Sequence, residues 1–201
     1  ESLRTEIRSP GIFQHKKCYV NYLPHGVVGV ISPWNYPLIL TASPVVEALM
    51  AGNAVVLKPS ELTPLTGQRM VELFHEGGVP EDTLQVVQGL GDVGSAIVES
   101  ELVDMICFTG SVEVGRKIAM ACAEQLKPVV LELGGKDPMI VLEDANLERA
   151  AGAAVWGGFS NCGQTCISAE RIYVVENVAD RFIKLVKKKT EELNTGPDKD
   201  Q

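Results

Sequence analysis

The chain has 201 residues, of which 45% are hydrophobic and 22% charged, and its formal net charge is -8. This composition is typical of a globular protein with a sizeable core. The negative charge argues against a nucleic-acid partner, because binding a polyanion needs a basic face. We also expect no membrane span, because the sequence has no run of about 18 apolar residues.

The cysteines are scattered and odd in number. They stand at positions 18, 107, 122, 162 and 166 and form no CxxC pair. An odd, scattered set favours free thiols in a reducing compartment. The first residues also lack the apolar stretch of a secretory signal. These features together predict a cytoplasmic protein.

Short apolar strands alternate with longer helical patterns, which predicts an α/β fold with a doubly wound parallel sheet. The predicted strands are 27–32, 54–57, 84–87, 105–108 and 129–133, and the predicted helices are 38–51, 63–76, a short segment after the glycines at 89–94, and 113–123. Ligands on such sheets bind at the carboxyl ends of the strands. The polar or turn residues at those ends, which we expect to converge on one edge, are Asn35, Lys58, Glu61, Gly89, Gly110, Ser111 and Glu132.

The pattern changes after Gly135, where the start of a second α/β domain is expected. It consists of a strand at 138–142, a helix at 146–159, a cysteine-containing loop, a strand at 171–175 and an amphipathic helix to about 193. The predicted domains are an N-terminal arm or oligomerisation-type strand (1–25), a partial nucleotide-binding domain (26–133) and the first part of a catalytic domain (134–201). Met105, Met120 and Trp156 are expected in the core.

Two of the turns suit a nucleotide. At Gly110 and Ser111, small residues let the backbone approach a ligand, and free N–H groups with the helix dipole favour a pyrophosphate. The full GxGxxG pattern is missing, so an ordinary turn is the alternative. Lys58 and Glu61 follow the second strand, where an acidic residue can accept hydrogen bonds from ribose hydroxyl groups. The alternative there is an exposed lysine beside a glutamate at a helix start.

A carboxylate and a thiol, Glu132 and Cys166, lie 34 positions apart. A thiol can add to a carbonyl, and a carboxylate can activate the water that releases the adduct. Glu132 lies in an apolar strand, where burial would disfavour its charged form; a strand-end residue facing solvent is the alternative. The alternative for Cys166 is a small buried hydrophobe. No metal is expected at Cys162 and Cys166, because all three histidines lie far upstream.

Five motifs together resemble the aldehyde dehydrogenase superfamily. They occur in family order and spacing within residues 16–195, as SPWNYP at 32–37, KPSE at 58–61, FTGS at 108–111, ELGGK at 132–136 and GQTC at 163–166. Linked motifs are far more specific than any one of them. The resemblance implies a Rossmann-like nucleotide-binding domain and oxidation of an aldehyde to a carboxylic acid with NAD, or with NADP as the alternative.

The resemblance implies a role for each matching catalytic residue. Cys166 would be the nucleophile that forms a thiohemiacetal and then a thioester. The Asn35 side chain and the backbone N–H of Cys166 would form the oxyanion hole. Glu132 would activate the water that hydrolyses the thioester.

The resemblance also implies the cofactor contacts. Lys58 and Glu61 would hold the adenosine ribose, and Glu61 favours NAD because a carboxylate repels a 2′-phosphate. Gly110 and Ser111 would contact the pyrophosphate, and Gly89 would line the adenine side. The remaining implied contacts are Pro33, Trp34, Ser60, Gly115 and Leu133.

Members of the superfamily are commonly much longer than this chain, which is therefore expected to be a piece of such an enzyme. A shortened chain would lose hydride transfer before acyl transfer. A cysteine-dependent esterase acting on ester substrates through Cys166 and Glu132 is thus the alternative function, and a non-catalytic remnant is a third. Apolar surface exposed on the helix at 146–159 predicts self-association, and we expect a homo-oligomer.

Overall fold

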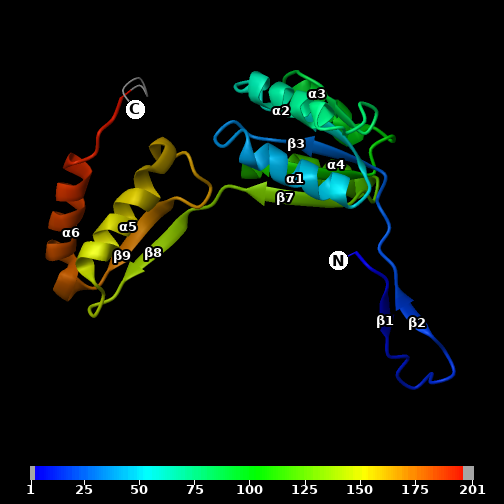
Figure 1. The fold of residues 1–201 in the computed structure, drawn as a ribbon. Helices are drawn as coiled ribbons and strands as arrows, with labels where there is room; N and C mark the ends of the chain where they lie inside the picture. The colour runs from blue at the N-terminus through cyan, green and yellow to red at the C-terminus, as the bar shows by residue number, and fades with distance from the viewer. Residues whose placement is uncertain (1–2, 197–201) are drawn as a thin grey trace. The chain divides into compact units, whose positions relative to one another are not determined.

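The computed structural model describes residues 3–196, which form two compact units (Figure 1). Unit 1 extends to Glu132 and unit 2 begins at Leu133. Within the described range, no helix is both long enough and apolar enough to cross a membrane.

Unit 1 is built on a five-stranded sheet in the order β5-β4-β3-β6-β7. The strands are β3 (Val27–Ile31), β4 (Ala54–Lys58), β5 (Leu84–Val86), β6 (Met105–Gly110) and β7 (Val129–Leu133). β3 pairs in parallel with both β4 and β6, and β4 pairs in parallel with β5. The predicted doubly wound α/β fold is therefore confirmed.

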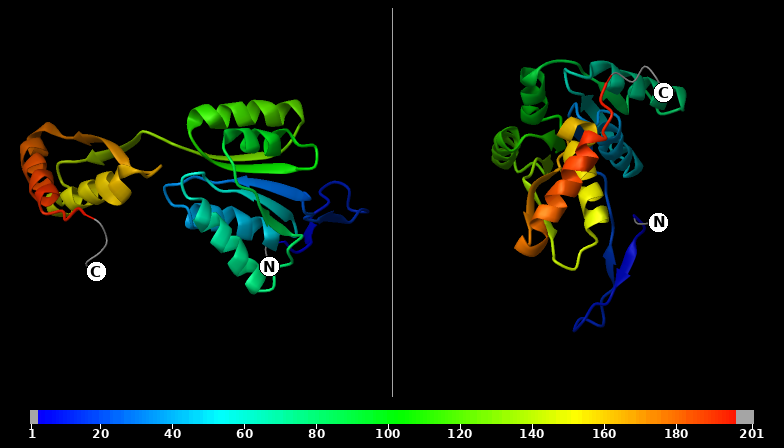
Figure 2. Two further views of the ribbon diagram at one scale, coloured as in Figure 1. Left: turned by 90° about the horizontal axis from the view of Figure 1, so that it is seen from above. Right: turned by 90° about the vertical axis from the view of Figure 1, so that its left-hand side faces the viewer.

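Helices cover both faces of this sheet, as Figure 2 shows. The helices α1 (Ile39–Met50) and α2 (Pro64–Glu76) lie on one face, and α3 (Gly91–Glu99) and α4 (Val112–Glu124) lie on the other. Strands covered on both faces need apolar side chains on both. This is why β3 and β4 are nearly continuous apolar runs, with Val30 and Leu57 almost inaccessible to solvent.

A hairpin precedes the sheet. β1 (Glu6–Arg8) pairs antiparallel with β2 (Cys18–Val20), so the expected N-terminal arm contains an extended strand, but also a second strand paired with it that the sequence did not predict. Both strands are only three residues long and one is mostly polar, so neither has the apolar run that marks a buried strand. Ile7 and Ile12 on this hairpin are more than 80% exposed.

Unit 2 contains a parallel strand pair, β8 (Asp137–Val141) and β9 (Ala169–Val174), with the helices α5 (Leu147–Phe159) and α6 (Glu176–Glu191). A short 3-10 turn, η1 (Ser160–Gly163), follows α5. The core contains Val141, Ala151 and Phe182.

Two of the three residues expected in the core are exposed. Trp156 is 72% exposed because α5 turns its small residues, such as Ala151 and Ala154, towards the core and Trp156 away from it. Met120 is 69% exposed because α4 buries Ile118 on its packed face instead. The expectation for these two side chains is therefore wrong.

Candidate active site

A cavity of about 660 Å³ lies in unit 1 at the carboxyl ends of β3, β4 and β6. Residues from the turns after all three strands line it. Seven of the ten residues predicted to bind a cofactor are among them: Pro33, Trp34, Lys58, Ser60, Glu61, Gly110 and Ser111. The expected convergence of these turns on one edge of the sheet is thus present in the structure for the nucleotide-type residues.

Lys58 is the unusual side chain of this cavity. It lines the cavity although only 5% of its side chain is exposed, so the alternative of an exposed surface lysine is wrong. Its Nζ donates to the Pro59 carbonyl at 3.0 Å and to the Glu61 carboxylate at 3.4 Å. Lysine is rarely buried without a partner, and here the partners hold the ammonium at the cavity wall.

Glu61 is about half exposed beside this ammonium. A hydrogen bond from its own backbone N–H is the main cause that lowers the pKa of Glu61; burial opposes it, and the charge and hydrogen bond of Lys58 lower the pKa further. The carboxylate is therefore ionised at neutral pH. Lys58 and Glu61 together offer a donor and an acceptor at the cavity, which is what a ribose diol needs.

Hydrogen bonds fix the turns that carry the other residues. The backbone N–H of Ser32 donates to the Lys58 carbonyl at 3.1 Å, and Thr41 Oγ1 donates to Ser32 Oγ at 2.7 Å. These bonds tie the turn after β3 both to β4 and to α1. At the third turn, Ser111 Oγ accepts from the backbone N–H of Val114 and so caps the first turn of α4.

Residues of α3 and α4 form the walls of the cavity, and their contribution was not predicted from the sequence. They include Gly91, Gly94, Ser95, Val98, Val114 and Ile118. A Cβ at Gly94 would lie 3.6 Å from Cδ of Lys58, so the glycine keeps open the space beside the lysine. The glycine-rich turn was the available signal, but it pointed to Gly89 rather than Gly94.

Three predicted cofactor residues lie outside the lining of this cavity. Gly89 has a φ of 158°, and a Cβ there would lie only 2.3 Å from Cγ2 of Val93, so this glycine permits a tight turn into α3. Gly115 is buried inside α4. Leu133 is the last residue of β7.

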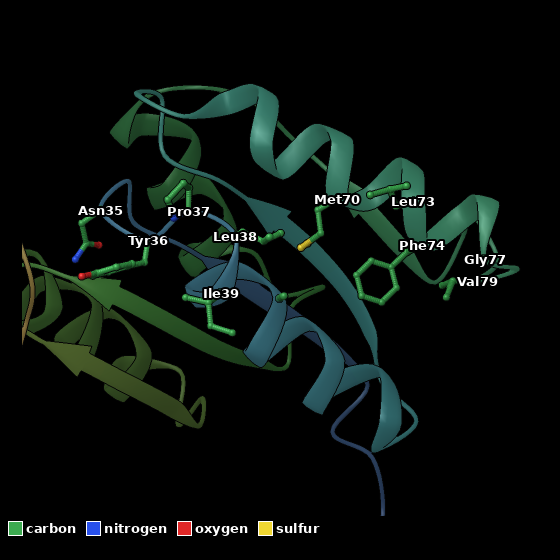
Figure 3. A pocket seen from close by; sticks show the side chains of 11 residues that line it. Asn35, Tyr36, Pro37, Leu38, Ile39, Met70, Leu73, Phe74, Gly77 and Val79 are labelled. Carbon is green, nitrogen blue, oxygen red and sulfur yellow. The ribbon is translucent and has the colours of Figure 1, made fainter. Parts of the chain in front are cut away.

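Asn35 lines a different hollow, an apolar groove of about 730 Å³ between α1 and α2. In Figure 3, Asn35 and Tyr36 lie at one end of this groove, and Met70 and Phe74 of α2 point into it. Asn35 is thus close in sequence to Pro33 and Trp34, which line the nucleotide-type cavity, but it lines the groove on the opposite face of the sheet, where α1 begins.

Glu132 is exposed, so the expected burial of this carboxylate is wrong. β7 is an edge strand, and its residues alternate between half-buried and exposed positions. Because β7 has a neighbouring strand on one side only, alternate side chains along it are left uncovered. Glu132 lines a hollow of about 450 Å³ beside α1, which also contains Glu47 and Cys107.

Cys166 lies in unit 2, in the loop between η1 and β9, and it is exposed. The alternative of a small buried hydrophobe is therefore wrong for this cysteine. Asn161 and Cys162, inside η1, have φ values of 51° and 59°. This left-handed conformation is uncommon for residues other than glycine. Within residues 3–196, no group of three or more His, Cys, Asp or Glu side chains is placed to hold a metal ion.

The family model described as the aldehyde dehydrogenase family matches residues 2–201. The 4,4'-diapolycopene aldehyde oxidase of a Methylomonas species is 44% identical over 190 residues, which cover 94% of this chain and 36% of that protein. The chain thus spans little more than a third of the length of this relative.

Solved structures give the same result. The Mycobacterium tuberculosis aldehyde dehydrogenase complexed with NAD+ matches with a TM-score of 0.93 at 40% identity, over 98% of this chain and 40% of that one. An E. coli NADP dependent enzyme matches with a TM-score of 0.93 at 38% identity, over 97% of this chain and 40% of that one.

Proposed function

The chain belongs to the aldehyde dehydrogenase family, and we propose that it supplies the nucleotide site and the nucleophile for NAD(P)-dependent oxidation of an aldehyde to a carboxylic acid. In this proposal unit 1 is the nucleotide-binding part and unit 2 begins the catalytic part. The observation that carries the proposal is the cavity at the carboxyl ends of three strands, with a buried lysine and an ionised glutamate at its wall.

The residues of this cavity fit a dinucleotide. Lys58 would donate to a ribose oxygen and Glu61 would accept from a ribose hydroxyl group. Gly110, Ser111 and the start of α4 would face the pyrophosphate, because free N–H groups at a helix start favour anions. Gly94 leaves room beside Lys58, and Trp34 lies at the wall.

NAD(P) supplies the acceptor for the hydride that the aldehyde loses. Similar structures include one complexed with NAD+ and one described as NADP dependent, so relatives use both cofactors. Glu61 favours NAD in this chain, because its carboxylate would lie near the 2′-phosphate that distinguishes NADP and would repel it.

We assign the chemical steps to three residues through the match to the family motifs. The thiolate of Cys166 adds to the aldehyde carbon, and the Asn35 amide with the backbone N–H of Cys166 donates to the oxygen that becomes negative. After oxidation a thioester on Cys166 remains. Glu132 then takes a proton from a water molecule, whose oxygen attacks the thioester and releases the acid. Nothing in the structure or among the similar proteins favours the esterase alternative.

We also propose that the protein forms homo-oligomers through the β1–β2 hairpin in a reducing, cytoplasmic-type compartment. The hairpin exposes large apolar side chains, including Ile7 and Ile12, and exposed apolar patches mark association sites. All five cysteines are free thiols, which fits a reducing compartment. Light scattering on the Ile7→Lys, Ile12→Lys double variant tests the interface, and an unchanged particle mass would contradict it.

The central test follows NADH formation from aliphatic and aromatic aldehydes, together with intact mass after brief exposure to aldehyde and NAD. Glu132→Gln is expected to accumulate an acyl group on Cys166, because attack by water is slowed. Cys166→Ala is expected to show neither the acyl adduct nor NADH. An equal rate of NADH formation in Cys166→Ala would overturn the assignment of the nucleophile, and an adduct on any other residue would do the same.

A further inference from the structure

Cys162 lies four residues before Cys166, in the short turn η1 that precedes the loop of Cys166 in unit 2, and the reaction proposed above gives it no role. Both thiols are exposed. We propose that Cys162 is a resolving thiol: when peroxide oxidises Cys166, Cys162 captures the product as a Cys162–Cys166 disulfide. The consequence for activity rests on the proposed function of Cys166, whereas the disulfide itself does not.

The backbone of the loop already folds the segment between the two thiols. Four residues of fully extended chain span about 14 Å, whereas a disulfide needs Cα atoms about 4.4–6.8 Å apart. One hydrogen-bonded turn shortens the segment, because the N–H of Gln164 donates to the Asn161 carbonyl at 3.1 Å. A second turn, in which the N–H of Ser168 donates to the Thr165 carbonyl at 3.1 Å, begins at the end of the segment and contains Cys166. Each cysteine occupies the second position of one of these turns.

The conformation at Cys162 also favours a rearrangement. Asn161 and Cys162 are both left-handed, a conformation that asparagine tolerates but that is unfavourable for cysteine. The intervening Gly163 adds freedom, because its φ of 75° is unstrained for glycine.

The other three thiols are poorer partners. Burial raises the pKa of both Cys107 and Cys122, which reduces the thiolate form that reacts. Cys18 belongs to the hairpin of unit 1. Cys162 is therefore the exposed thiol nearest in the chain to Cys166, in the turn that precedes its loop.

The chemistry balances with hydrogen peroxide as the oxidant. The Cys166 thiolate attacks one peroxide oxygen, the O–O bond breaks, and a sulfenic acid and hydroxide form. The Cys162 thiolate then attacks the sulfenic sulfur, the S–S bond forms, and a second hydroxide leaves and is protonated to water. Two thiols and one peroxide become one disulfide and two waters, and a dithiol reductant reverses the change.

The disulfide has a protective effect on Cys166. Without a resolving thiol, continued oxidation takes a sulfenic acid to the sulfinic acid, which thiol reductants do not reverse. With Cys162 present, the oxidation of Cys166 stops at the disulfide, which is reversible. Cys162 would then preserve the nucleophile through a pulse of oxidant at the cost of temporary inactivity.

Peptide mapping of the full chain after hydrogen peroxide treatment tests the proposal. The unaltered chain should yield a linked Cys162–Cys166 peptide about 2 Da lighter than the dithiol, restored by dithiothreitol. Cys162→Ser should yield Cys166 sulfinic acid instead, about 32 Da heavier and not restored. Cys18→Ser is the matched control and should behave like the unaltered chain.

Two results would overturn the proposal: equal formation of sulfinic acid in the unaltered chain and in Cys162→Ser, or a disulfide from Cys166 to any other cysteine. Failure of the proposed function gives a different signature. In that case the linked peptide still forms, but no acyl group appears on Cys166 with aldehyde and NAD.

Discussion

Replacing Lys58 with methionine separates cofactor binding from stability. Methionine has nearly the length of lysine and suits the stem, which is buried. Glu61, the charged partner, is about half exposed and can be solvated when the ammonium is removed. We therefore expect the free energy of unfolding to change by about 1 kcal/mol or less.

The effect on NAD binding should be larger. A hydrogen bond from a charged donor contributes about 1.5–3 kcal/mol, and 1.4 kcal/mol corresponds to a tenfold change in Kd. Lys58→Met should thus raise the Kd for NAD by about 10- to 100-fold. Isothermal titration calorimetry on the folded variant, with circular dichroism to verify the fold, measures both quantities.

Lys117→Met is the matched control, because Lys117 lines the same cavity but its side chain is 71% exposed and paired with Glu113. A solvated lysine of this kind contributes about 1 kcal/mol or less, so the Kd should change by less than about fivefold. Unchanged NAD affinity in a folded Lys58→Met chain would refute the assignment of this cavity to the ribose. Absence of NAD binding by the unaltered chain at millimolar concentration would refute it as well.

Four further variants test the packing and the charges. Gly67→Ala should destabilise the fold by about 1–3 kcal/mol in thermal melts, because its Cβ would lie 2.6 Å from Cβ of Pro59. Gly152→Ala is the contrasting change, because no other atom lies within 4 Å of the added Cβ, and it should stabilise the fold by about 0.5–1 kcal/mol. Lys127→Met should cost about 1–3 kcal/mol in urea unfolding, because the buried ammonium donates to two carbonyls at the end of α3; an unchanged midpoint would contradict this. Glu61→Gln should raise the use of NADP relative to NAD in steady-state kinetics. Folding lowers the pKa of Glu61 from its ordinary value of 4.5, so the ionised carboxylate stabilises the fold at pH values above 4.5. This contribution to stability is lost as the pH falls below 4.5, through the lowered pKa of the folded chain. Glu61→Gln should not show this loss of stability.

The sheet was predictable because its strands are buried on both faces. A strand such as β4 must be apolar along its whole length, and glycine or proline marks its ends, so its position can be read from local sequence. The hairpin strand β1 was missed for the opposite reason. It is exposed, partly polar and three residues long, so only its partner β2 identifies it as a strand.

Burial was predicted less well, because it depends on which elements become neighbours. Glu132 lies in an apolar segment, but β7 is placed at the edge of the sheet, so its alternate residues are uncovered. Trp156 has the composition of a core residue, yet the smaller side chains of α5 fill the space against α6. Neither the order of the strands nor the packed face of a helix follows from the apolar content of one segment.

The position of the cavity follows from the order of the strands in the sheet, which the motif matches do not describe. From β3 the chain proceeds to β4 and β5 on one side and then returns, so that β6 pairs with the other side of β3. Helices before and after this return lie on opposite faces of the sheet and diverge, which opens a crevice at the carboxyl end of β3. Lys58 and Ser111 are 53 positions apart in the chain, yet both must border that crevice, because Lys58 ends one strand adjacent to β3 and Ser111 follows the other. The topology alone would therefore place a ligand site here, and the buried lysine identifies the side of it that receives a polar group.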